Sequence, residues 1–83
     1  MGEEIFLALD RLTNIFAEQY YCSVEFKIKD MDLIVRILGR KLSTSYTIPL
    51  QNKTLNIPEY IRQLEKRYQD ECINYIIKEN KGG

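Results

Sequence analysis

Residues 22–50 read CSVEFKIKDMDLIVRILGRKLSTSYTIPL, and this stretch decides the fold. Apolar and polar side chains alternate along it with a period of two, which is the pattern of strands buried on one face. Turn-forming residues divide the stretch into three runs, so we expect strands at about 22–29, 32–38 and 41–48. The breaks between these runs are only two residues long, which predicts an antiparallel meander.

A hairpin loop at residues 30–31 defines the pairing of the first two strands. It places the large apolar side chains on one face, in the facing pairs Val24 with Ile37, Phe26 with Val35 and Ile28 with Leu33. The same register sets Glu25 opposite Arg36 and Lys29 opposite Asp32, two opposite-charge pairs that each contribute roughly 0.2–1 kcal/mol. A shift by one residue would break both features, so the pairing itself supports the register.

The second turn is predicted at Gly39-Arg40. Glycine at the first central position favours a type II′ turn, because glycine tolerates a positive φ angle. This turn places Ile37 opposite Leu42 and keeps the apolar side chains on the inner face. The inward residues of the third strand are then Leu42, Thr44, Tyr46 and Ile48. Pro49 ends that strand, since it has no backbone N–H to donate.

Amphipathic helices are predicted on both sides of the strand region. Residues 3–20 carry apolar side chains at helical spacing, with Leu7 as the one apolar residue on the opposite face. The apolar stripe of this helix consists of Ile5, Leu9, Leu12, Phe16 and Tyr20. The second helix is expected at 57–79, because Asn56 is a favoured N-cap and Glu59 stands three residues later, as in a capping box.

The expected fold class is α+β, in the order α-β-β-β-α. Both helices pack on one face of a three-stranded antiparallel meander, in a single domain that spans residues 1–83 and ends in a flexible tail at 80–83. The second helix should measure about 36 Å, whereas a seven-residue strand measures about 23 Å. We therefore expect the end of this helix to project beyond the sheet.

The composition disfavours several classes of function. Twelve basic and twelve acidic residues cancel, and the chain contains no histidine, the commonest acid–base catalyst and a common zinc ligand. Cys22 and Cys72 lie on faces expected to be buried, and two thiolates are too few for a structural zinc site. Neither a phosphate-binding glycine loop nor a catalytic motif occurs. We therefore expect no enzymatic activity, no cofactor and no metal.

The same features indicate where the protein acts. No apolar run reaches membrane length, and the acidic start Gly2-Glu3-Glu4 does not resemble a signal peptide. Together with two free thiols, this favours the reducing cytoplasm and no membrane partner. The chain is also rich in Ile, Lys, Asn and Tyr, residues with AT-rich codons. Small proteins of this composition are common in phages and mobile elements of AT-rich bacteria, so we expect such an origin.

Two sets of apolar residues lie where a solvated surface is usually polar. Ile34 and Leu38 point to the outer face of the predicted sheet, and Ile73, Ile76 and Ile77 occupy the projecting end of the second helix. Apolar groups beyond what one core buries favour a protein partner. Our first hypothesis is therefore a small interaction module or regulator that binds another protein. We also expect a homodimer through the three isoleucines.

Basic residues on the sheet support an alternative function, the binding of nucleic acid. They are Lys27, Lys29, Arg36, Arg40 and Lys41. The order α-β-β-β-α resembles that of the double-stranded RNA-binding domain, a family whose second helix begins with phosphate-binding lysines. In this chain that position reads Asn56-Ile57-Pro58-Glu59, with glutamate where lysine would be needed. The balanced net charge also disfavours binding through phosphates.

Overall fold

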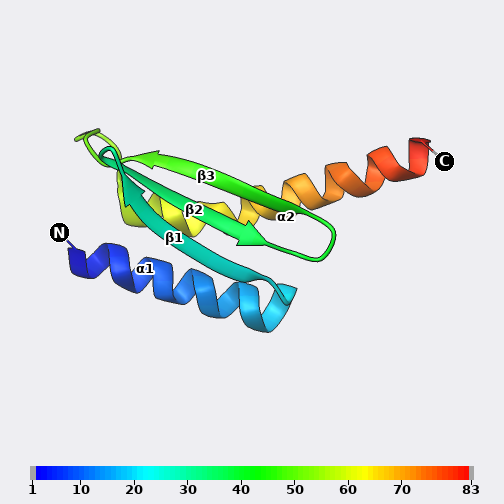
Figure 1. The fold of residues 1–83 in the computed structure, drawn as a ribbon, viewed down its shortest axis with the longest axis horizontal. Coiled ribbons are helices and arrows are strands. Elements are labelled where there is room, and N and C mark those ends of the chain that lie inside the picture. Colours follow the sequence, from blue (N-terminus) through cyan, green and yellow to red (C-terminus); the bar gives the residue numbers. More distant parts are fainter. Residues whose placement is uncertain (1, 83) are drawn as a thin grey trace.

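The computed structural model describes residues 2–82 and the side chains of residues 3–79. Its elements are α1 (Gly2–Ile15), the π-helical turn η1 (Phe16–Tyr20), β1 (Ser23–Lys29), β2 (Asp32–Leu38), β3 (Ser43–Pro49) and α2 (Ile57–Gly82) (Figure 1). The three strands form one antiparallel sheet in the order β1-β2-β3. This arrangement confirms the expected α+β class and the α-β-β-β-α order.

One hydrophobic core lies between the sheet and the two helices. The inner faces of β2 and β3 supply five buried side chains, Leu33, Val35, Ile37, Tyr46 and Ile48. The helical segments meet them with Leu9, Leu12, Phe16, Ile57, Ile61, Leu64 and Tyr68. These strand residues alternate along β2 and β3, so their side chains all lie on one face of the sheet. Both helices pack against these side chains, and the two helices therefore cover the same face.

The first hairpin has the register that the sequence predicts. Val24 lies opposite Ile37, Phe26 opposite Val35 and Ile28 opposite Leu33. Glu25 lies opposite Arg36 and forms an ion pair with it, with 3.6 Å between Oε2 and Nη1. The loop residues Asp30 and Met31 have φ angles of 52° and 67°. Positive values at both positions define a type I′ turn, which matches the twist of the strands although neither residue is glycine or asparagine.

The second turn differs from the prediction. Leu38 pairs with Ser43, so residues 39–42 form the loop in place of a two-residue turn, and the register moves by two residues. No described glycine has a positive φ angle, so Gly39 does not occupy the first central position of a type II′ turn. Because the shift is two residues, the side chains predicted to face inward on β3 still do so.

Tyr68 explains the longer loop. Its hydroxyl donates a hydrogen bond to the carbonyl oxygen of Leu42 at 2.9 Å. A Cβ atom on Gly39 would lie 2.5 Å from that hydroxyl and 2.6 Å from the Leu42 oxygen. Glycine is therefore required for close approach rather than for its backbone angle.

The inner face of β1 is less buried than the sequence predicts. Phe26 and Ile28 point to the helix side, yet their exposed fractions are 42% and 69%. Figure 1 shows the reason: α1 and β1 meet at η1 and diverge toward the start of α1. Phe6 on α1 is also 64% exposed, so Leu7 is not the one apolar residue outside the core. The prediction that β1 alternates between buried and solvated faces was wrong beyond Val24.

The first helical segment ends after Tyr20, as predicted, although its last turn is π-helical, whereas the second helix continues past its predicted end. The first continues through η1 and stops at Tyr21, a non-glycine residue with a left-handed φ of 55°. The amide of Cys22 closes this end by donating to the carbonyl of Phe16 at 2.9 Å. The second helix begins as predicted, because Asn56 Oδ1 accepts a hydrogen bond from the Glu59 amide at 3.2 Å. It runs to Gly82, so residues 80–82 are helical where a flexible tail was expected, and Gly83 lies outside the described residues.

Candidate interaction surfaces

The projecting end of α2 carries an apolar surface, which we call the isoleucine face. It consists of Ile73, Ile76 and Ile77, whose exposed fractions are 55%, 50% and 46%. Their spacing of three and four residues places them on one side of the helix. Figure 1 shows this part of α2 extending past the sheet. Among the α2 side chains described up to Glu79, Tyr68 is the last that is buried, so the isoleucine face lies beyond the core.

The isoleucine face is confined to the last turns of α2. Gln69 and Lys66 lie on the same side of the helix one and two turns earlier, and both are exposed. Cys72 and Tyr75, on the side toward the core, are only partly buried. The apolar surface is therefore short, and it ends where the helix begins to contact the core.

The outer face of the sheet is less apolar than the sequence suggests. Ile34 and Leu38 are both half-buried rather than exposed. Ile34 lies between Lys27 and Thr47 on the neighbouring strands, which flank its side chain. This face therefore offers single, partly covered apolar side chains and no open apolar patch.

The five basic residues proposed to bind nucleic acid do not form one patch. Lys29 adjoins the first hairpin loop, whereas Arg40 and Lys41 lie in the loop at the opposite end of β2. Arg36, between them, is paired with Glu25. The charge of Arg36 is thus partly offset, which weakens its attraction for phosphates, and Lys27 is the cation beside it on the same face.

Arg40 and Lys41 instead border a hollow that contains both cysteines. Its volume is about 470 Å³, and its other lining residues are Tyr20, Tyr21, Cys22, Leu42, Tyr68 and Cys72. The Cys22 thiol lies 3.4 Å from the Tyr68 hydroxyl oxygen. Burial, followed by the hydrogen bond with Cys22, raises the pKa of Tyr68 well above its usual value. The Tyr68 hydroxyl also donates to the Leu42 carbonyl, so these contacts join α2 to the second loop.

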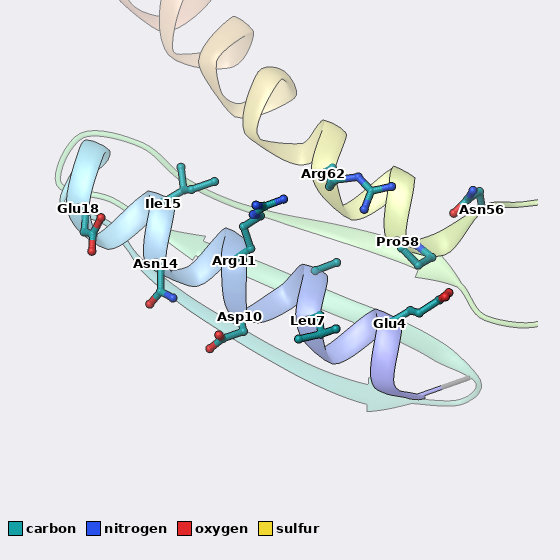
Figure 2. A pocket seen from close by; sticks show the side chains of 11 residues that line it. Glu4, Leu7, Asp10, Arg11, Asn14, Ile15, Glu18, Asn56, Pro58 and Arg62 are labelled. Carbon is teal, nitrogen blue, oxygen red and sulfur yellow. The ribbon is translucent and has the colours of Figure 1, made fainter.

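A second open groove runs between α1 and the start of α2 (Figure 2). It has a volume of about 750 Å³ and is lined largely by polar residues. Figure 2 shows Asp10, Asn14 and Glu18 pointing away from α2, so their polar groups do not converge. Arg62 is already paired with Glu59 at 2.8 Å. The titratable side chains that line the groove are therefore spread along it rather than gathered at one point.

Sequence reasoning missed one surface, which lies along β1. Phe26 and Ile28 are exposed there, with Met31 in the adjoining loop and Phe6 on the neighbouring helix. The period-two pattern identifies the face on which a side chain lies, but it does not show whether a helix covers that part of the face. The one signal in the sequence is that a first strand in a meander is an edge strand.

Within residues 2–82, no group of three or more Cys, Asp or Glu side chains is arranged to hold a metal ion. Neither helix in that part of the chain combines the length and apolarity needed to span a membrane. Comparisons with protein-family models, curated proteins and solved structures gave no match for this chain. The exposed surfaces described above therefore carry the functional argument.

Proposed function

We propose that this protein is a small, non-enzymatic interaction module that binds another protein through the isoleucine face of α2. The observation that carries the proposal is the exposure of Ile73, Ile76 and Ile77 on a helix end that projects past its own core. A monomer gains nothing from this arrangement, because apolar groups in water oppose solubility. Proteins of this size and composition are typical of phages and mobile elements, and such an origin is part of the proposal.

The shape of the surface indicates the kind of partner. Apolar side chains at positions i, i+3 and i+4 of a helix are the anchors of helix-in-groove recognition. Three half-exposed isoleucines present on the order of 300 Å², whereas a stable interface buries about 800 Å² on each partner. Two copies meeting through this face alone would fall short of that area. A partner whose apolar groove surrounds the helix would also contact its polar flanks, which supplies the remaining area.

The test compares three forms of the full chain as bait in lysate of the native host. The wild type is set beside Ile73→Lys/Ile77→Lys and beside Leu7→Lys, a control on α1 whose leucine is more exposed than either isoleucine. All three should show the same circular dichroism, since each replaced side chain is about half-exposed or more. A partner should be captured by the wild type and by the control. The double variant should bind the purified partner at least about a hundredfold more weakly, as loss of two anchors predicts.

Equal capture by all three baits would refute the role of the isoleucine face. Sedimentation equilibrium of the wild type and the double variant tests the expected homodimer through the same residues. If the isoleucine face joins two copies, the double variant will be monomeric where the wild type is dimeric.

A further inference from the structure

The free edge of β1 is a second candidate interaction surface, and it is independent of the proposed function of α2. β1 is the first strand of the sheet, so one side of its backbone is unpaired within residues 2–82. Successive residues of a strand direct their N–H and C=O groups to alternate sides. The carbonyl of Met31 accepts a hydrogen bond from the Leu50 amide at 3.1 Å and so faces β3. The backbone N–H and C=O groups of Asp32 must then face β1.

This alternation identifies the backbone groups on the free edge. Lys29 pairs with Asp32 and closes the hairpin, so Lys29 bonds toward β2. Val24, Phe26 and Ile28 therefore direct their N–H and C=O groups outward. The pairing of β1 with β2 is continuous along the strand, and β1 contains neither a bulge nor a proline. These are the usual devices that block an edge strand, and only its lysines remain as protection.

The sequence of β1, SVEFKIK, is complementary to itself when two copies run antiparallel. With Phe26 opposite Phe26 of the second copy, Val24 lies opposite Ile28 on the inner face. Glu25 then lies opposite Lys27 on the outer face, at positions where side chains approach closely. A shift of two residues in either direction would place Glu25 opposite Glu25 or Lys27 opposite Lys27. Only the register centred on Phe26 matches apolar side chains, charges and free backbone groups together.

We propose that β1 binds β1 of a second copy of this chain, forming a six-stranded antiparallel sheet with a two-fold axis at Phe26. Because directly opposite residues share a face, all helices lie on the same side of that sheet. The pairing uses the backbone groups of Val24, Phe26 and Ile28, and it covers the side chains of Phe26 and Ile28, which are exposed in one copy.

Phe6 supports the same pairing from α1. Ala8 and Ile15 line the groove toward α2, and at 100° per residue Phe6 lies on the opposite flank, toward β1. α1 and β1 are antiparallel and meet at η1, so the early part of α1, which contains Phe6, lies on the same side of η1 as the end of β1. A second copy on the free edge would therefore face an exposed apolar flank of α1 as well as the strand.

The first experiment measures oligomeric state by sedimentation equilibrium of the full chain. The wild type should dimerise in the micromolar range, and Ile28→Lys should weaken the dimer on the order of a hundredfold, since each dimer contains two such sites. Ile77→Lys is the matched control on the isoleucine face and should leave this dimer unchanged. A wild type that stays monomeric, or a dimer lost in Ile77→Lys and kept in Ile28→Lys, would overturn the proposal.

A charge exchange tests the register. Lys27→Glu and Glu25→Lys each create like-charge pairs in their own homodimers, and each should weaken dimerisation about tenfold. Mixing the two variants restores both opposite-charge pairs, so the heterodimer should regain wild-type affinity. Failure of the mixture to associate better than either variant alone would exclude the Phe26-centred register.

Amide hydrogen exchange provides a test that needs no variant. The amides of Val24, Phe26 and Ile28 should become protected as the protein concentration rises, because only the second copy pairs with them. The amides of Glu25 and Lys27 bond to β2 and should be protected at every concentration. Concentration-independent exchange at Val24, Phe26 and Ile28 would overturn the proposal.

Discussion

Replacing Gly39 by alanine should disrupt the contact between the second loop and α2. The added methyl group would lie 2.6 Å from the carbonyl oxygen of Leu42 and 2.5 Å from the hydroxyl of Tyr68. Tyr68 is only 4% exposed and cannot swing into solvent, so the loop must shift. Overpacking of this kind typically costs about 1–3 kcal/mol, and we expect the upper half of that range because one of the two contacts is backbone.

Tyr68→Phe provides the partner in a double-mutant cycle. It removes the hydrogen bond to Leu42 and should cost about 1–2 kcal/mol, because a partly buried carbonyl loses its donor. In the double variant Gly39→Ala/Tyr68→Phe, the methyl group no longer meets a hydroxyl. The double variant should therefore lose about 1 kcal/mol less unfolding free energy than the sum of the losses in the two single variants.

Urea unfolding followed by circular dichroism measures all three variants, with Tyr21→Phe as the control. Tyr21 is 80% exposed, so removal of its hydroxyl should change the unfolding free energy by less than about 0.5 kcal/mol. Strict additivity of Gly39→Ala and Tyr68→Phe would refute the reasoning, as would a Gly39→Ala variant as stable as the wild type. Either result would mean that Gly39 is not held there by close approach.

Three further predictions follow from local structure. Met31→Gly should raise the unfolding free energy by about 1 kcal/mol in urea titrations, because glycine adopts a φ of 67° without strain; lower stability would contradict this. Burial raises the pKa of Tyr46 and Tyr68, so the unfolding free energy that their neutral hydroxyls contribute is complete below pH 10 and is lost as the pH rises above it. A urea midpoint of unfolding that stays constant from pH 9 to 11 would contradict this. A thiol reagent should modify half-buried Cys72 before buried Cys22, as peptide mass spectrometry would show; equal rates would contradict this.

The register of the first hairpin could be predicted from sequence because three independent signals agree on it. The apolar alternation, the Glu25–Arg36 pairing and the length of the loop all require the same register. The second turn could not be predicted, because its length depends on Tyr68, which is 26 residues from Leu42 in the sequence. The sequence around Gly39 predicts a positive φ angle at this position, whereas in the structure Gly39 is needed because a side chain there would collide with Tyr68 and Leu42. Local signals predict a turn only where no distant side chain enters it.

The two candidate surfaces also differ in whether they could be predicted from the sequence. The exposure of Ile73, Ile76 and Ile77 follows from helix length compared with strand length, and both lengths can be read from sequence. The exposure of Phe26 and Phe6 depends on how far α1 diverges from β1, which is set by the end of η1 at Tyr21. A non-glycine residue in the left-handed region gives little signal in a sequence. The β1 surface was therefore not predictable from periodicity.

Pro49 determines how large an assembly of this sheet can become. It lies at the end of β3, the other border of the sheet, where its ring replaces an N–H that would otherwise face outward. The exposed neighbours on this strand are Ser43, Ser45 and Thr47, which favour hydration over stacking. A pair joined through β1 would therefore present only its two β3 borders, neither of which accepts another strand well. Growth would stop at two chains, and the protein would remain a discrete particle rather than a fibre.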